Sequence, residues 1–155
     1  MFNIVLVHPQ IPQNTGTIGR VCVNTNSKLH IIKPIGFDLS EKAVRRAGLD
    51  YWKLLDLTVW ESLDEFLEAF KDKRDRFFFS TTKTDKRYFE VEFQKGDFLF
   101  FGSETAGIPE EFMKKQPQNM ITIPMGENGR SLNLSVSVGI VLYDAIRQVG
   151  GVIKG

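Results

Sequence analysis

The sequence is poor in the residues that build disulfides, metal sites and membrane spans. Its 155 residues include one cysteine, Cys22, which excludes an internal disulfide, fits a reducing cytoplasm and, between two valines, is expected in the core. His8 and His30 are the only histidines and follow no cysteine pattern, so no metal site is expected. No apolar run reaches the ~18 residues of a membrane span, and the amino terminus lacks the basic stretch of a signal peptide. We therefore expect a cytoplasmic protein with no membrane partner.

Charge is a weak signal as well. The formal net charge is +1, whereas nucleic-acid binders usually carry a basic footprint. Residues 71–87 contain seven basic and three acidic side chains, but a solvated face explains such a run as well as a binding surface does. With 42% hydrophobic and 25% charged residues, the composition is that of an ordinary globular domain. Composition alone identifies no partner.

Several common nucleotide and hydrolase motifs are absent. The chain contains no G-x-G spacing and no G-x-x-x-x-G-K-[ST] loop, which argues against a Rossmann-type methyltransferase or dehydrogenase and against a P-loop enzyme. It has no G-x-S-x-G elbow, which argues against a serine hydrolase. What remains is a ligand site assembled mainly from backbone groups, with Arg, Glu, Asn, Ser and Tyr available for chemistry.

The apolar patterning predicts strands that alternate with helices, hence an α/β fold with a mainly parallel sheet flanked by helices. No repeat or linker divides the chain, so residues 1–155 are expected to form a single domain. The unbroken run Phe77–Phe79 predicts a central strand buried on both faces. The expected strands are Asn3–Val7, Leu29–Lys33, Leu55–Trp60, Arg76–Thr81, Asp97–Phe101 and Met120–Ile123. The expected helices are about Asn14–Asn26, Ser40–Arg46, one beginning at Ser62, and about Asn133–Val149.

Three loops follow predicted strands and combine Gly or Pro with small polar side chains. They are Pro9–Arg20, Phe101–Pro109 and Ile123–Ser135. Ligands of parallel α/β sheets bind outside the carboxyl ends of the strands, where these loops should meet. Such loops suit a ligand recognised by backbone groups, for instance the edge of an adenine.

These three loops resemble the three motifs of the SPOUT class of RNA ribose methyltransferases. The match is closest to the YibK-like tRNA (cytidine/uridine 2′-O) wobble methyltransferases, to which the segments Arg45–Tyr51 and Tyr143–Gln148 are also similar. The resemblance covers Asn3 to Gly150. Two departures are the alanine at 106, where relatives commonly have arginine in E-T-R-G-I-P, and the valine at 136, where N-L-S-N is frequent.

The resemblance implies a SPOUT domain with a deep C-terminal trefoil knot and no appended RNA-binding domain. It implies S-adenosylmethionine as cofactor, S-adenosylhomocysteine as product, no metal, a tRNA substrate and a homodimer. The implied reaction is 2′-O-methylation of the wobble ribose, of cytidine or a modified uridine. The positions that match cofactor-contacting residues are Ser80, Thr81, Gly102, Ile123 and Ser131. For Gly102 we expect that a side chain would obstruct the ligand, or else that the glycine only forms a turn at the end of a strand.

The resemblance also assigns roles to polar residues of the three loops. Arg20 matches an arginine thought to help deprotonate the ribose hydroxyl; because arginine stays charged near neutral pH, positioning and stabilisation of the developing alkoxide come first. Asn14 would hold that arginine or the ribose, or else cap a helix. Glu104 would fix neighbouring backbone or Arg20. The remaining catalytic candidates are Ser131 and Asn133 at the start of the last helix, and Tyr143, near substrate or in the core.

Three arginines, Arg45, Arg46 and Arg147, are candidates for phosphate contacts, which give affinity but little sequence information. Two other functions stay open. The target could be another tRNA ribose or an rRNA ribose, or the chain could be a catalytically silent RNA-binding protein that keeps the fold.

Overall fold

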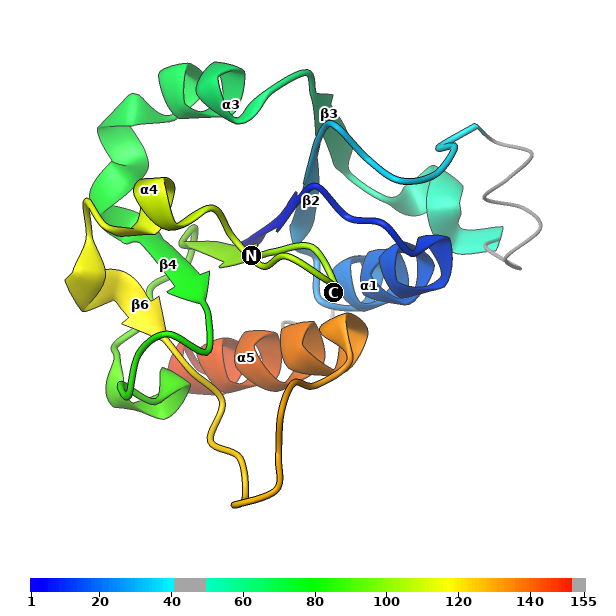
Figure 1. Ribbon diagram of the computed structural model, residues 1–155. Coiled ribbons are helices and arrows are strands. Elements are labelled where there is room, and N and C mark those ends of the chain that lie inside the picture. The colour runs from blue at the N-terminus through cyan, green and yellow to red at the C-terminus, as the bar shows by residue number, and fades with distance from the viewer. Residues whose placement is uncertain (41–49, 152–155) are drawn as a thin grey trace.

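The computed structural model describes residues 1–40 and 50–151. Six strands form one sheet in the order β3-β2-β1-β5-β4-β6, and every strand pair in it is parallel (Figure 1). The predicted α/β fold with a parallel sheet is therefore confirmed. The strands are β1 (Asn3–Val7), β2 (Lys28–Ile32), β3 (Leu57–Trp60), β4 (Phe77–Ser80), β5 (Phe98–Phe101) and β6 (Met120–Ile121).

Helices cover both faces of the sheet. One face packs against α1 (Pro12–Asn24) and α5 (Leu134–Gln148), and the other against α3 (Leu63–Ala69) and α4 (Glu110–Met113) (Figure 1). The carboxyl ends of the strands open toward the loops that precede α1, α4 and α5. Four short 3₁₀ helices complete the described elements: η1 (Asp50–Leu54), η2 (Lys71–Arg76), η3 (Tyr88–Glu90) and η4 (Pro117–Asn119).

Strand β4 carries the aromatic run that predicted a central strand. It lies between β5 and β6, and its alternating side chains enter both cores: Phe78 packs with the α1/α5 layer, and Phe77 and Phe79 with the α3/α4 layer. Fully burying a phenylalanine contributes about 1.5–3 kcal/mol, so the run secures the sheet to both helical layers. Cys22 lies in the first core, as predicted, where burial raises the pKa of its thiol to about 12.

Several element boundaries differ from the sequence predictions. Helix α1 begins at Pro12 instead of Asn14, because proline is well accommodated in a first helical turn where no N–H partner is needed. Asn14 is therefore not the residue that caps this helix. Strand β3 begins at Leu57 instead of Leu55, because η1 extends to Leu54.

Other expectations are untested or only partly covered. The short helix expected from Ser40 to Arg46 falls almost wholly outside the described residues, and the trefoil knot stays a prediction. In the described part of the chain, no helix is long and apolar enough to cross a membrane.

His30, a residue of β2, has a hydrogen-bond partner at each of its two ring nitrogens. Its ring is 3% exposed, its Nε2 lies 2.9 Å from Asn3 Oδ1, and the indole N–H of Trp60 donates to its Nδ1 at 3.1 Å. Only the neutral imidazole with a proton on Nε2 satisfies both partners, because a proton on Nδ1 would face the indole N–H. Burial lowers the pKa of His30 to about 4, which agrees with a neutral ring.

This network predicts a loss of stability in mild acid. The folded state holds the pKa of His30 near 4, below its ordinary 6.5, so the contribution is complete above about pH 6.5 and is lost as the pH falls toward 4. The free energy of unfolding should fall by about 3 kcal/mol across this range, measured by urea titration. His30→Gln should flatten the slope, whereas the control His8→Asn, at a half-buried histidine with φ of 58°, should retain it. An unchanged slope in His30→Gln would contradict the assignment.

Candidate functional site

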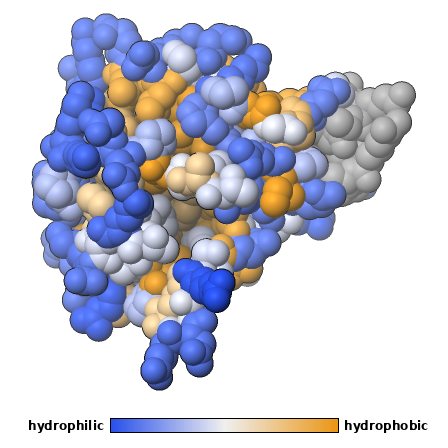
Figure 2. All heavy atoms as spheres, in the orientation of Figure 1, coloured by the Kyte–Doolittle hydropathy of each residue, from blue (hydrophilic) through white to orange (hydrophobic). Residues whose placement is uncertain are grey.

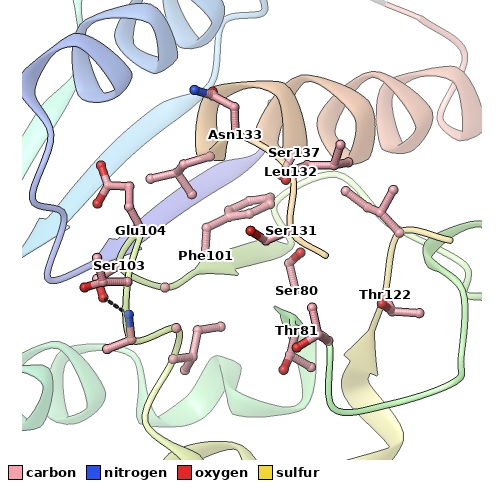
Figure 3. Close-up of a pocket in the computed structure, with 18 of the residues that line it drawn as sticks. Ser80, Thr81, Phe101, Ser103, Glu104, Thr122, Ser131, Leu132, Asn133 and Ser137 are labelled. Atoms are coloured by element: carbon pink, nitrogen blue, oxygen red, sulfur yellow. Dashed lines mark hydrogen bonds between the residues drawn. The ribbon is translucent and has the colours of Figure 1, made fainter. Parts of the chain in front are cut away.

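A cavity of about 500 Å³ opens at the carboxyl ends of β4, β5 and β6. It is lined by residues of all three predicted loops, and Figure 2 shows this face of the molecule hollowed near its middle. In Figure 3, Ser103 and Glu104 lie on one side of an open centre and Thr81 and Thr122 on the opposite side. All five residues expected to contact the cofactor line this cavity: Ser80, Thr81, Gly102, Ile123 and Ser131.

The cavity wall is polar but almost without charge. Among the described residues that line it, Lys83 and Glu104 are the two with ionisable side chains. The Lys83 ammonium pairs with the carboxylate of Glu110, and Glu104 is occupied by N–H donors described below. Hydroxyl groups and strand-end backbone make up much of the rest. This donor set and this size fit a nucleoside-like ligand better than a multiply charged anion.

Gly102 directly follows β5 and begins a tight turn. The Ser103 hydroxyl accepts the Ala106 N–H at 2.9 Å, and the Ser103 carbonyl accepts the Gly107 N–H at 3.1 Å. A Cβ at position 102 would lie 2.0 Å from the Gly107 carbonyl carbon and 2.2 Å from the Ile108 nitrogen, so no side chain fits. Glycine is thus required at position 102 because the backbone of Gly107 and Ile108 packs against it, in addition to any space that a ligand needs.

Glu104 joins the second loop to the first. Its two carboxylate oxygens accept the backbone N–H groups of Gln10 and Ile11, each at 2.9 Å, and the side-chain amide of Asn14 at 3.2 Å. These donors surround the amino terminus of α1, where N–H groups lack helical partners and favour a negative charge. The prediction that Glu104 fixes neighbouring backbone is confirmed, and its oxygens do not contact Arg20.

Asn14 links Glu104 to the third loop through a second hydrogen bond. Its Oδ1 accepts a hydrogen bond from Asn133 Nδ2 at 3.1 Å, while its own amide donates to Glu104. Asn133 is the residue that caps α5, because its Oδ1 accepts the N–H groups of Ser135 at 2.9 Å and Val136 at 3.3 Å. Each amide is oriented by a donor on one side and an acceptor on the other. The three loops therefore meet in one relay, Glu104–Asn14–Asn133, at the cavity wall.

The structure does not bring every predicted residue to this cavity. Arg20, Tyr143 and Arg147 lie on exposed helix surfaces and do not line it. Tyr143 is 49% exposed, so its alternative placement in the core is wrong. Arg147 pairs with Asp144, three residues earlier in α5, at 2.9 Å. The other two phosphate candidates, Arg45 and Arg46, lie outside the described residues.

Several residues that line the cavity were not predicted from the sequence. Ser137 follows Asn133 by four positions and therefore lies on the same side of α5, so helical spacing could have indicated it. Thr122 and Leu132 directly adjoin predicted contacts. Lys83 comes from a loop with no recognisable pattern, and nothing in the sequence marks it.

Within residues 1–40 and 50–151, no group of three or more His, Cys, Asp or Glu side chains could hold a metal ion.

Comparison with known proteins identifies the family. Residues 1–143 match the model of the SpoU rRNA Methylase family, whose members bind S-adenosylmethionine. The chain is 46% identical over 151 residues to an Escherichia coli (strain K12) protein named tRNA (cytidine(34)-2′-O)-methyltransferase, covering 97% of this chain and 95% of the relative. A solved structure described as concerning the 2-OH methylation of C/U34 on tRNA superposes with a TM-score of 0.88 at 41% identity, covering 96% and 95% of the two chains.

A more distant match extends the likeness of fold. The AdoMet-bound rRNA methyltransferase from Sinorhizobium meliloti has a TM-score of 0.81 at 20% identity, with 94% of this chain and 56% of that chain covered. The sequence motifs, the sheet order and the family model agree, and the chain belongs to the SpoU methylase family.

Proposed function

We propose that this protein transfers a methyl group from S-adenosylmethionine to the 2′-hydroxyl of the wobble ribose of a tRNA, without a metal. One observation carries the proposal: the five residues expected to contact the cofactor, from segments far apart in the sequence, line a single cavity of nucleoside size. Relatives of the same length and more than 40% identity are named for this reaction. A tRNA substrate and a free buried thiol fit a cytoplasmic protein.

S-adenosylmethionine, when bound, supplies a methyl group activated by its sulfonium sulfur and leaves as S-adenosylhomocysteine. Ser80, Thr81, Gly102, Ile123 and Ser131 would hold it. The ribose oxygen forms its bond to the methyl carbon as the bond from that carbon to sulfur breaks, and the hydroxyl proton passes to solvent water. The task of the protein is to align the oxygen with the methyl carbon, since such positioning can supply several kcal/mol of the barrier.

Within this reaction Glu104 and Asn14 are positioning residues. The Glu104 carboxylate already accepts three N–H groups, so it is poorly placed to remove a proton. Asn133 and Ser131 present the start of α5 to the cavity. Because Asn14 and Asn133 are hydrogen-bonded to each other, a shift in one loop would move the cofactor wall and the substrate side together.

Arg20 requires a different explanation, because it faces away from the cavity of its own chain. It follows Asn14 by six residues, which places it about 240° further round α1, on a different side of the helix. It shares the outward face of that helix with Gln13, Thr17 and Asn24, all exposed. We infer that a second copy of the chain brings its Arg20 to the cavity. There the guanidinium would orient the ribose and stabilise the negative charge that develops on its oxygen.

The outer face of α5 is the proposed contact between the two copies. Val136 and Tyr143, seven residues apart on one side of the helix, are each 49% exposed, and Ile140 lies between them. Exposed Ile11 and Leu132 adjoin this helix start. Isolated exposed apolar side chains are ordinary, but a row of them beside a cavity favours an interface. Arg147 at the end of the same face would contact tRNA phosphates, with Arg45 and Arg46, once phosphate displaces its partner Asp144.

The reaction is tested by mapping the methyl group. Protein incubated with labelled S-adenosylmethionine and unmodified total tRNA should methylate the wobble ribose. Arg20→Ala should lower the rate about 10²–10³-fold, as expected for loss of a charge-stabilising donor, while calorimetry shows unchanged cofactor binding. Methylation of another tRNA ribose or of rRNA would select the second function. An absence of both turnover and cofactor binding would select the silent RNA-binding protein.

Glu104→Gln should disturb the site by replacing an acceptor with an amide that opposes the N–H groups of the first loop. We expect about tenfold weaker cofactor binding and at least tenfold slower transfer, since the change replaces a charge-assisted hydrogen bond to the first loop by an amide that faces an N–H group. Isothermal titration and single-turnover rates measure both. Glu111→Gln, the same change at an exposed residue of α4, is the control and should resemble the parent. Equal behaviour of the two variants would refute the role of Glu104.

Val136→Asp should convert the proposed dimer to monomers by placing a charge in an apolar contact. Light scattering after gel filtration measures the mass, and the transfer rate should fall with it because Arg20 is then withheld from the cavity. Phe89→Asp, the same charge at a 46% exposed aromatic on η3, should leave the mass unchanged. A parent protein that is monomeric at micromolar concentration yet active would rule out the shared site.

A further inference from the structure

Within the described part of the chain, the Arg20 side chain contacts the Tyr51 ring. Its guanidinium carbon lies 5.0 Å from the centre of the Tyr51 ring. Among residues 1–40 and 50–151 it has no hydrogen bond or ion pair. A cation–π contact of this kind holds the guanidinium over the ring face without using any of its five N–H donors. The contact therefore orients the group without using the donors that a substrate oxygen would need.

Tyr51 is itself fixed to the turn of α1 that carries Arg20. The Tyr51 hydroxyl donates a hydrogen bond to the Gly16 carbonyl. In an α-helix this carbonyl also receives the N–H of the residue four positions later, which is Arg20. Tyr51 thus contacts both the Gly16 carbonyl of this helical turn and the Arg20 side chain that follows it.

The neighbouring Trp52 brings η1 close to the same helix. A Cβ at Gly19 would lie 3.0 Å from a ring carbon of Trp52, a tight contact that would require the Trp52 side chain to shift by a few tenths of an ångström. Burial is also the main cause that raises the pKa of Tyr51 above its ordinary value, so its hydroxyl remains protonated as the donor to Gly16. The packing of η1 on α1 therefore determines where the Tyr51 ring stands.

We propose that Tyr51 is a positioning residue for methyl transfer: its ring holds the guanidinium of Arg20 in the orientation that meets the substrate ribose. This rests on the proposed role of Arg20 in the reaction. An arginine without such support samples many rotamers, and small displacements of a reacting group cost large factors in rate. Tyr51 acts through Arg20, so its loss should lower kcat, with little change in cofactor binding.

The test compares ring-retaining and ring-removing changes in the full chain. Tyr51→Phe loses the hydroxyl but keeps the ring and should stay within about threefold of the parent kcat, whereas Tyr51→Leu should lose about tenfold. The KM for S-adenosylmethionine should change in neither. In an Arg20→Ala background, measured under single-turnover conditions, Tyr51→Leu should cause no further loss, because residues that act as a unit are not additive.

A loss of aromatic packing alone gives a different result. Phe70→Leu removes a half-buried ring on the opposite face of the sheet and should lower the melting temperature without lowering kcat. As a measurement independent of turnover, the arginine Nε–H resonance of Arg20, assigned by its absence in Arg20→Lys, should carry a ring-current shift in the parent and in Tyr51→Phe. In Tyr51→Leu that shift should vanish.

The outcomes separate the two proposals. Parent-like kcat in Tyr51→Leu, an equal loss in the Arg20→Ala background, or no ring-current shift would overturn the role of Tyr51 while the methyl-transfer function stands. If the parent methylates no ribose, or if Arg20→Ala is as active as the parent, the proposed function or its arginine fails first. A Tyr51→Leu chain that does not fold is replaced by Tyr51→Met, which keeps bulk without a ring face.

Discussion

The arrangement of the site depends on one carboxylate. Glu104 accepts two backbone N–H groups and one side-chain amide from the first loop, across ninety or more residues of sequence. These are charge-assisted bonds at a helix start, about twice as strong as bonds between neutral groups. Through Asn14 the same carboxylate fixes Asn133, which caps α5. Three loops that share no strand pairing with one another are thereby held as one wall.

This relay explains why the cavity can be nearly neutral and still specific. With its carboxylate satisfied by N–H groups, Glu104 adds little net attraction for a cation, and Lys83 is balanced by Glu110. Recognition must then rest on shape and on backbone and hydroxyl groups at strand ends, for which Gly102 provides the close return of the chain. The proposed charge for catalysis comes from outside this wall, on Arg20. Binding of cofactor and stabilisation of the reacting oxygen are thus separate tasks of separate segments.

The sequence predicted the fold class, the two-sided burial of β4 and the meeting of the three loops, because each depends on local apolar pattern and strand order. It did not predict where Asn14 sits, since the start of α1 at Pro12 moves that residue from the cap into the first turn. The Asn14–Asn133 bond spans 119 residues, and no periodicity encodes such a pairing. The sequence indicated Tyr51 only as part of the segment that resembles the family, because contact with an arginine 31 positions earlier produces no local sequence pattern.

The near-zero net charge was uninformative because it does not separate paired from unpaired cations: eight of the sixteen Lys and Arg side chains in residues 1–40 and 50–151 already have an acidic partner. Arg76 holds the buried carboxylate of Asp97 at 2.6 Å, and in the basic stretch around it Lys83 and Arg87 have acidic partners. A paired cation offers little to a phosphate, because its partner must first be displaced. Arg20 shares the absence of a carboxylate partner within the described chain with several other cations, and Arg74 also lies over a ring, but Arg74 donates to Gln116 whereas the Arg20 guanidinium lies over the Tyr51 ring with its donors unused. For a near-neutral protein that is proposed to bind RNA, the partners and orientation of each individual cation are therefore more informative than the net charge.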